Sequence, residues 1–337
     1  MQGIEKFKYY MQLYLDDVAH SNKSEQTVRN YGKAFKQFIE YWNEYGELEN
    51  DPRTPLFRAW RNAMDAKGLK PSTVKNYLMA LHIFFSYYAD EESDAGELVY
   101  GGRNPVSKKL YPKQENKQYD VILSDEQVSL LWANERPTSK QAHHWARNYC
   151  ICVLLLDSKI RNAECLDLRL SDVFLNEGFL IVRHGKGGKQ REVTLSPISV
   201  SAIRLYLASG LRPSSLSDDD YLFGTTADAT GLYGQTEWHR GTSQWLSSLI
   251  ERHVFSVTGV HNVRTHDLRH IGARLNLNTG VTLEALESEL GHSSFAVTQI
   301  YTGKLQTRQS KRDGARNAMR IRDEWAARNM EMLNGIS

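Results

Sequence analysis

Apolar residues in the first third of the chain recur at helical spacing. From Ser24, and again from Pro71, they fall three or four positions apart, which places them on one face of a helix. We expect their aromatic side chains to form a helical core rather than a platform for stacking bases. The apolar positions are Val28, Tyr31, Phe35, Phe38, Ile39 and Trp42 in the first segment and Val74, Tyr77, Leu78, Leu81, Phe84, Phe85 and Tyr88 in the second.

The helical pattern breaks after Arg103. Asn104-Pro105 is a turn signal, and the following residues are polar, basic and interrupted by Pro112. This predicts a linker over 104–120, which could also lie against a phosphate backbone. The linker would separate a helical domain, 1–103, from a second domain, 121–337.

The second domain begins with a helix signal. Ser124 and Gln127 fit a capping box. An apolar helix ending near Leu156 and a helical stretch around Glu164 should follow. Together with the first domain they predict a mainly α protein with some α+β character.

A β-hairpin interrupts the helices of the second domain. Two strands, 179–183 and 191–195, flank the Gly- and Lys-rich turn 184–190. The expected fold is therefore a helical N-terminal domain and a mostly helical second domain with a small antiparallel sheet. Segment 214–241, which is polar and Gly-rich, is predicted to be a loop.

Composition excludes little. Lys and Arg number 42 against 40 Asp and Glu, a net charge of +2 that neither demands nor excludes a nucleic-acid partner. The N-terminus lacks the apolar stretch of a signal peptide, and no apolar run could span a bilayer. We therefore expect a cytoplasmic protein without a membrane partner. Cys150, Cys152 and Cys165 lack a second pair that would complete a metal site, so buried thiols in a reducing compartment are expected.

The segment 265–270, Thr-His-Asp-Leu-Arg-His, carries candidate chemistry. With Thr265 as N-cap, His266 and Arg269 would share a face of the first helical turn, where amide donors and the helix dipole favour a phosphate. One alternative is zinc hydrolysis, because His266 and His270 nearly match the His-Glu-x-x-His pattern. Another is a helix start with solvated charges.

Four more residues would complete a phosphoryl-transfer site that needs no metal. Arg161, with Glu164 three residues on, could join Arg269 in clamping phosphate oxygens. Tyr301 becomes a nucleophile only if its proton is removed and its oxyanion faces cations. His292 could handle that proton near neutral pH. Lys186, in the hairpin turn, could protonate a departing 5′ oxygen.

This ordered set resembles the tyrosine recombinase and integrase family, which includes phage integrases and chromosome-dimer resolving recombinases. The resemblance identifies Glu164 and His270 as supporting residues. The spacing of nine residues from His292 to Tyr301 also agrees with the family. The six matching catalytic positions are Arg161, Lys186, His266, Arg269, His292 and Tyr301.

The resemblance implies a site-specific DNA recombinase that closes around duplex DNA. Tyr301 would attack a phosphodiester to form a 3′-phosphotyrosyl link, and a partner strand's 5′ hydroxyl would then displace the tyrosine. Two such rounds, through a four-way (Holliday) junction in a homotetramer on synapsed DNA, would complete recombination without cofactor, metal or ATP. The free protein would be a monomer or dimer.

Some positions depart from the family pattern. Lys159-Ile160 precedes Arg161 where Thr-Gly followed by Leu is usual, which could alter the turn, and Gly303 replaces a common His or Arg. Segment 214–241 is longer than expected and could be an insertion. No N-terminal arm-binding domain is predicted. The resemblance implies that the charged tail 308–329 docks as a helix into a neighbouring subunit; the alternative is a solvated helix.

Two other functions remain open at this point. A type IB topoisomerase shares this chemistry but religates the same strand. A catalytically inactive DNA-binding relative would keep the fold alone. The complete set of six residues favours an active enzyme, and the two-domain layout favours a recombinase.

Overall fold

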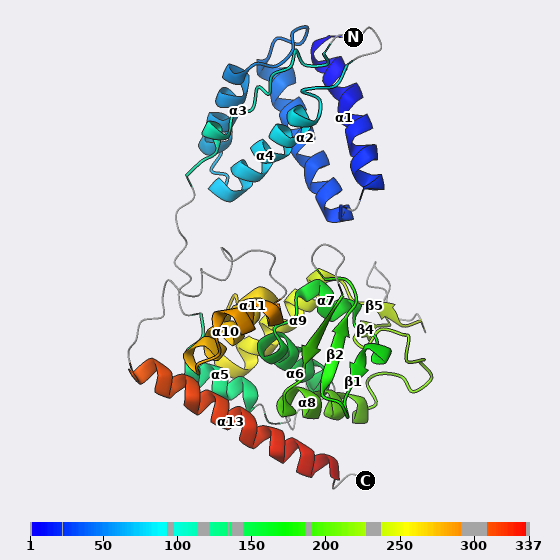
Figure 1. Ribbon diagram of the computed structural model, residues 1–337, viewed down its shortest axis with the longest axis vertical. Helices are drawn as coiled ribbons and strands as arrows, with labels where there is room; N and C mark the ends of the chain where they lie inside the picture. The colour runs from blue at the N-terminus through cyan, green and yellow to red at the C-terminus, as the bar shows by residue number, and fades with distance from the viewer. Residues whose placement is uncertain are drawn as a thin grey trace. The chain divides into compact units, whose positions relative to one another are not determined.

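The computed structural model divides into two compact units, Met1–Gln118 and Tyr119–Ser337, which we treat one at a time (Figure 1). It describes residues 2–21, 23–92, 98–113, 122–133, 135, 144–185, 190–226, 237–290 and 309–334.

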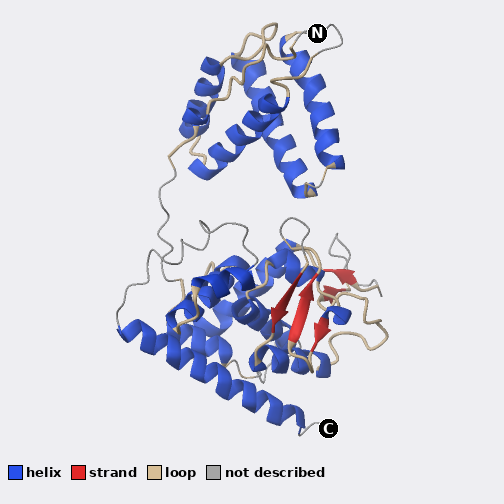
Figure 2. Ribbon diagram, in the orientation of Figure 1, coloured by secondary structure: helices blue, strands red, loops and turns tan. Residues whose placement is uncertain are grey.

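The first unit is helical, as predicted (Figure 2). The Ser24 hydroxyl caps the second helix by accepting a hydrogen bond from the Thr27 amide at 3.2 Å, and a proline opens the fourth. Both helices start where the apolar pattern starts. The α-helices described in this unit are α1 (Gly3–His20), α2 (Glu25–Tyr45), α3 (Thr54–Ala66) and α4 (Pro71–Tyr87).

Aromatic side chains form the core of the first unit. Phe7 of α1 lies against Phe38 of α2 and Phe84 of α4, with ring centroids 5.6 and 5.0 Å apart. All three rings are fully buried. The expectation of an aromatic core is confirmed, and burial of this kind removes large apolar areas from water.

The start of the predicted linker packs on this core. Val106 is fully buried there and Leu110, which ends the short 3-10 turn η1 (Lys108–Leu110), is almost so. The Asn104 side-chain oxygen accepts a hydrogen bond from the Val106 amide at 2.8 Å, which fixes the turn. The first unit therefore extends further along the chain than the helical pattern alone indicated.

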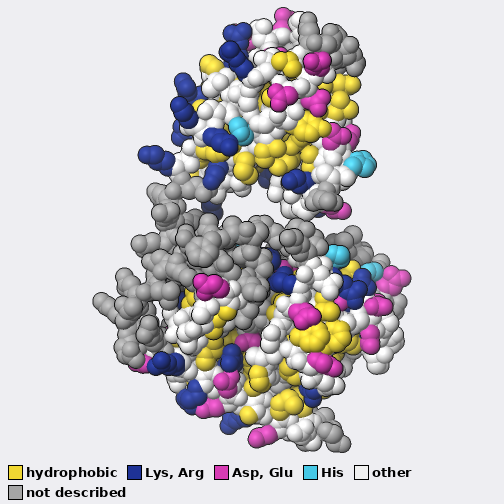
Figure 3. Space-filling view, in the orientation of Figure 1, with side chains coloured by type: hydrophobic (Ala, Val, Ile, Leu, Met, Phe, Trp, Pro, Cys, Tyr) yellow, Lys and Arg dark blue, Asp and Glu magenta, His cyan; other side chains and the backbone are white. Residues whose placement is uncertain are grey.

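Charge is unevenly spread over the first unit. In Figure 3, Lys and Arg side chains gather over α3 and the neighbouring start of α4, whereas Asp and Glu lie toward α1. Arg53, Arg58 and Lys67, at or near α3, are all exposed. This side of the unit is therefore electropositive although the whole chain is almost neutral.

The second unit is mostly helical. The predicted capping box is present: Ser124 Oγ accepts from the Gln127 amide at 3.2 Å, and Gln127 Oε1 accepts from the Ser124 amide at 2.9 Å. The helices described are α5 (Asp125–Trp132), α6 (Trp145–Val153), α7 (Asn162–Asp167), α8 (Pro197–Ala208), α9 (Ser243–Thr258), α10 (Thr265–Asn278), α11 (Leu283–Leu290) and α13 (Gln309–Asn334).

The predicted hairpin is present within a three-stranded antiparallel sheet. Strand β2 (Phe179–Val182) pairs with β3 (Arg191–Thr194), and β1 (Val173–Phe174) adds to the free edge of β2. Leu180 and Val193 face each other in the register and are buried, which directs one face of the sheet into the core.

The segment 214–241 is not wholly a loop, so that prediction is partly wrong. Strands β4 (Gly224–Thr225) and β5 (His239–Arg240) pair there. Buried Leu222 and Phe223 fix the segment in the core, and the Trp238 indole donates to the Tyr221 carbonyl at 2.9 Å. Strands of two residues are too short to show an alternating period that could be recognised in the sequence.

The charged tail forms helix α13, which packs on α5, α8 and α10 of its own unit. Ala315, Ala318 and Ala326 are buried in these contacts. The Asn329 amide, also buried, lies 3.3 Å from both Tyr149 Oη and Ser201 Oγ. The alternative of a solvated helix is therefore wrong, because α13 packs along its own unit; docking on a neighbouring subunit stays a prediction.

Cys150, Cys152 and Cys165 are buried and unlinked, as expected for structural thiols. Burial raises the pKa of each thiol, which disfavours the reactive thiolate. Among the described helices, none is both long and apolar enough to cross a membrane.

Candidate active site

Arg161 stands at the N-terminus of α7. Its backbone amide donates to Glu164 Oε2 and its Nη1 to Glu164 Oε1, both at 2.7 Å. Glu164 is almost completely buried, whereas about a quarter of the Arg161 side chain, 23%, reaches solvent. One carboxylate therefore caps the helix and orients the guanidinium.

An unusual backbone leads into Arg161. Helix α6 widens into a π-helical turn, η3 (Leu154–Ser158), and Lys159 then adopts the left-handed conformation with φ of 53°. Glycine adopts this conformation without cost, and the related family usually has glycine in this turn. The departure at Lys159 therefore leaves the chain reversal intact, at a conformational cost of about 1–2 kcal/mol.

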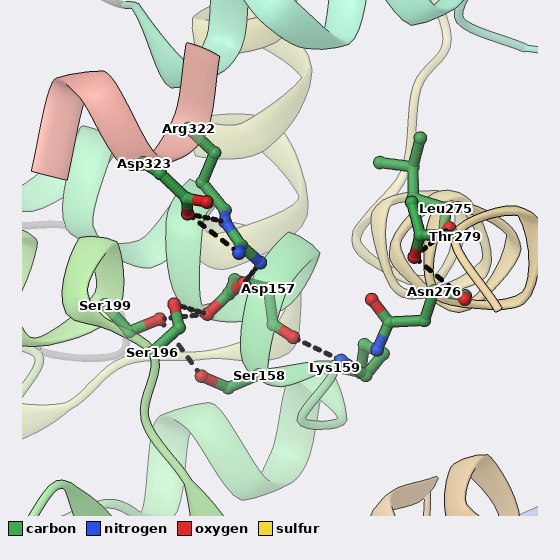
Figure 4. Close-up of polar contacts among 10 residues, drawn as sticks. All are labelled: Asp157, Ser158, Lys159, Ser196, Ser199, Leu275, Asn276, Thr279, Arg322 and Asp323. Atoms are coloured by element: carbon green, nitrogen blue, oxygen red, sulfur yellow. Dashed lines mark hydrogen bonds and ion pairs between the residues drawn. The ribbon is translucent and has the colours of Figure 1, made fainter. Parts of the chain in front are cut away.

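The π-helical turn is held by Asp157 (Figure 4). Its carboxylate accepts hydrogen bonds from Ser196 Oγ at 2.5 Å and Ser199 Oγ at 2.8 Å, both at the start of α8. Arg322 of α13 reaches it from the other side at 3.2 Å. Lys159 Nζ donates to the Asp157 carbonyl at 2.5 Å, so the turn is fixed to α8 and α13 on its way to Arg161.

Helix α10 lies directly against this turn. A Cβ atom added at Gly272 would lie 1.8 Å from the Leu156 carbonyl oxygen, closer than any atoms can approach without a shift of the backbone. Only glycine therefore allows this approach, which brings the start of α10 beside the start of α7. Asn162 and Thr265 meet there through their side chains at 3.3 Å.

The N-cap of α10 is Arg264, not Thr265 as predicted. Asp267 accepts a hydrogen bond from the Arg264 amide at 2.8 Å. Thr265 instead accepts from Asn162 of α7, so its hydroxyl is used to join two helices. The prediction was wrong because capping preference ranks Thr above Arg and cannot anticipate a tertiary partner.

Arg269 is 1% exposed and points into the unit. Its Nη1 donates to the Lys159 carbonyl, and its Nη2 donates to the Leu290 carbonyl at 2.6 Å. Leu290 ends α11. One guanidinium therefore ties together the turn before Arg161, helix α10 and the end of α11.

His266 lies at the surface near both arginines. Partial desolvation and the charges of Arg269 and Arg161 lower the pKa of its imidazole, against an opposing effect of Asp267. The ring is therefore neutral at pH 7 and can accept a proton. The ring of His270 lies edge-on to it, with centroids 4.5 Å apart.

The structure thus brings together the predicted residues Arg161, Glu164, His266, Arg269 and His270 at the starts of α7 and α10. The other three predicted residues, Lys186, His292 and Tyr301, lie outside the described residues. Within the described part of the chain, no group of three His, Cys, Asp or Glu side chains could hold a metal ion, so His266 and His270 gain no third ligand there.

Arg191 joins this cluster although no motif in the sequence marked it as a site residue. Both of its terminal nitrogens contact the Glu164 carboxylate at 2.8 Å. A signal existed: Arg191 shares the strand face of buried Val193, because alternate residues point the same way. A charge on an inward face needs a buried partner.

Comparisons with known proteins identify the family of the chain. Residues 121–308 match the phage integrase family model, and residues 11–92 match the N-terminal SAM-like domain of phage integrases. The chain therefore belongs to the phage integrase family, the tyrosine recombinases. This confirms both the resemblance and the class of enzyme inferred from the motifs.

Two relatives illustrate the similarity in sequence. Tyrosine recombinase XerC of Bacillus subtilis strain 168 is 27% identical over 309 residues, covering 89% of this chain and 93% of the relative. Tyrosine recombinase XerA of Pyrococcus furiosus is 28% identical over 301 residues, covering 89% and 88%.

Solved structures agree on the fold. The XerH recombinase bound to palindromic difH after cleavage aligns with a TM-score of 0.61 at 22% identity, over 84% of this chain and 78% of that one. A lambda integrase dimer bound to a COC′ core site aligns with a TM-score of 0.60 at 16% identity, over 89% and 96%. The predicted mainly α fold with a small antiparallel sheet is confirmed.

Proposed function

We propose that this chain cuts and rejoins duplex DNA at a specific site through a phosphotyrosyl intermediate on Tyr301. The observation that carries the proposal is the convergence of Arg161, His266 and Arg269 at the adjoining starts of α7 and α10. Two guanidinium groups beside helix N-termini suit the dianionic transition state of phosphoryl transfer. Their supporting groups are buried, so little reorganisation is needed during reaction.

In the proposed reaction, Tyr301 Oη attacks the phosphorus and its proton passes to a histidine, His266 or His292. The bond from phosphorus to the 5′ oxygen breaks, and Lys186 protonates that oxygen. Arg161 and Arg269 stabilise the pentavalent transition state, with Glu164 orienting Arg161 and His270 supporting the site. The products are a 3′-phosphotyrosyl link and a free 5′ hydroxyl.

Rejoining reverses these steps with the 5′ hydroxyl of a partner strand. One phosphodiester is exchanged for another, so neither ATP nor a metal ion is required. Two rounds in a homotetramer, through a Holliday junction, would complete recombination. The electropositive side of the first unit, over α3, is suited to the DNA backbone (Figure 3). XerH and lambda integrase were solved on DNA sites, which supports a DNA partner.

Covalent capture from a random pool of DNA tests the proposal and recovers the target sequence in the same step. The protein is incubated in EDTA with nicked duplexes whose centre is randomised, and denaturation-resistant adducts are recovered and sequenced. We expect adducts enriched in one sequence, lost in Tyr301→Phe and retained in Tyr45→Phe, an exposed tyrosine of the first unit. A strict requirement for a metal ion, or adducts that persist in Tyr301→Phe, would contradict the mechanism.

A relaxation assay separates recombination from topoisomerase activity. Efficient relaxation of a supercoiled plasmid that lacks the recovered sequence would favour a type IB topoisomerase. No adduct from any duplex would favour a DNA-binding protein without catalysis.

A further inference from the structure

Glu164 is shared between two arginines. Its Oε1 accepts from Arg161 Nη1 at 2.7 Å and from Arg191 Nη1 at 2.8 Å, and its Oε2 accepts from Arg191 Nη2 at 2.8 Å. The side chain of Glu164 is 2% exposed and that of Arg191 is 14% exposed. Arg191 thus makes a two-pronged contact in a place from which water is largely excluded.

Arg191 comes from a different part of the fold. It opens strand β3, opposite Val182 at the end of β2, at the base of the hairpin. The turn of that hairpin includes Lys186 in the sequence. Glu164 therefore connects the base of the hairpin with the start of α7, two parts of the chain that both carry residues of the proposed reaction.

Electrostatics favours a fixed carboxylate at this point. Burial alone would raise the pKa of Glu164, but hydrogen bonds from Arg191 and Arg161 outweigh it and lower the pKa to about 2. The carboxylate is therefore ionised at any working pH. Because Arg191 contacts both of its oxygens, the carboxylate cannot rotate without breaking a charged hydrogen bond.

We propose that Arg191 is a positioning residue of the active site, acting through Glu164 to hold the guanidinium of Arg161. The proposal rests on the proposed function, because it takes Arg161 and Arg269 to be the two arginines that bind the phosphate, which we call the clamp. Lysine at 191 keeps the charge but cannot contact both oxygens. With lysine there, the Glu164 carboxylate can turn toward Arg161 and draw its guanidinium away from the phosphate.

The hairpin supplies a matched control. Arg183, directly after β2, donates from Nε to the carboxylate of Asp172, which is also buried. Asp172 accepts from the Arg169 amide at 2.9 Å and caps the short turn η4 (Leu170–Asp172) rather than orienting Arg161. Arg183→Lys therefore weakens an arginine–carboxylate pair in the same hairpin without touching the proposed clamp.

The test measures single-turnover formation of the covalent adduct on a nicked duplex of the sequence recovered by covalent capture. Loss of the residues that orient metal-binding side chains typically costs about 10–100-fold in activity, and we expect a loss of similar size in Arg191→Lys. Arg183→Lys should form the adduct at a rate within about threefold of that of the unmodified protein. This should hold even if the substitution lowers the melting temperature as much as Arg191→Lys does.

A second substrate separates positioning from general loss of structure. A methylphosphonate at the cleaved position carries one negative charge fewer than a phosphodiester. The reaction on this substrate therefore depends less on the position of an arginine. The defect of Arg191→Lys should shrink on this substrate to less than about threefold. Glu164→Gln combined with Arg191→Lys should be no slower than the slower single variant, because both changes act on one contact.

Equal slowing on both substrates, additive effects of the two substitutions, or a normal rate in Arg191→Lys would each overturn the proposal. Adduct formation by the unmodified protein would, in all three cases, leave the proposed function standing. If the unmodified protein formed no adduct, the proposed function would fail and the role of Arg191 would fail with it.

Discussion

The two units bury different kinds of side chain. Among the described residues, every buried charged side chain lies in the second unit, including Lys159, Glu164, Asp172 and Arg269. In the first unit the described core is apolar and rich in aromatic rings. Apolar burial stabilises a fold without fixing any one atom, whereas a buried charge must have its partners in place. The second unit therefore accepts a desolvation cost where it needs fixed geometry.

The largest expected effect concerns the aromatic core of the first unit. Phe84→Ala removes a fully buried ring, which should destabilise that unit by about 3–5 kcal/mol. Hydrogen exchange of peptides from each unit would report the loss separately. Met79→Ala, at an exposed site on the same helix, is the control. A comparable loss of protection in the second unit would contradict the expectation that the destabilisation stays within the first unit.

The next effect concerns the buried charges of the second unit. Arg269→Lys keeps a cation but cannot hold the Lys159 and Leu290 carbonyls together. On the proposed mechanism it should slow adduct formation by about 10²–10³-fold. Arg274→Lys, five residues further along α10 and paired with Asp125 at 2.8 Å, should leave the rate nearly unchanged. Equal rates in the two variants would show that Arg269 does not stabilise the transition state at the phosphate.

Acid should act on the second unit through Glu164. The pKa of Glu164 is about 2 in the folded protein against an ordinary 4.5, so its contribution is complete above pH 4.5 and is lost as pH falls toward 2. The difference corresponds to roughly 3 kcal/mol. Stability of the second unit, measured by denaturant unfolding followed by hydrogen exchange, should fall over this range. In Glu164→Gln the stability of the second unit should depend much less on pH. If its stability falls with pH as steeply as in the unmodified protein, other carboxylates are responsible.

The smallest effect concerns the left-handed turn before Arg161. Lys159→Gly loses the hydrogen bond to the Asp157 carbonyl but relieves the backbone, so unfolding free energy should change by less than about 1 kcal/mol. Lys159→Ala loses the same hydrogen bond without relief and should be about 1 kcal/mol less stable than the glycine variant. Denaturant titration of both variants checks this; an alanine variant as stable as the glycine variant would contradict it.

Local patterns predicted much of the fold. Helices α2 and α4, the Ser124 capping box and the β2–β3 hairpin follow from periodicity and capping preferences that act within a few residues. The strand pair β4–β5 could not be predicted in this way, because its strands are two residues long and are held by distant core contacts.

The candidate site divides in the same way. The types and order of Arg161, His266 and Arg269 could be recognised in the sequence. The contacts that hold them could not, because they join positions far apart in the chain: Arg269 to the Lys159 carbonyl and Arg191 to Glu164. The close approach at Gly272 likewise depends on a carbonyl more than a hundred residues earlier.

The phosphotyrosyl mechanism is tested most directly by identifying the amino acid that carries the DNA. A trapped adduct would be digested with protease and nuclease, and the nucleotide-bearing peptide sequenced by mass spectrometry. We predict a 3′-phosphate ester on Tyr301. A nucleotide on any other side chain, or a link through the 5′ end of the DNA, would contradict this mechanism.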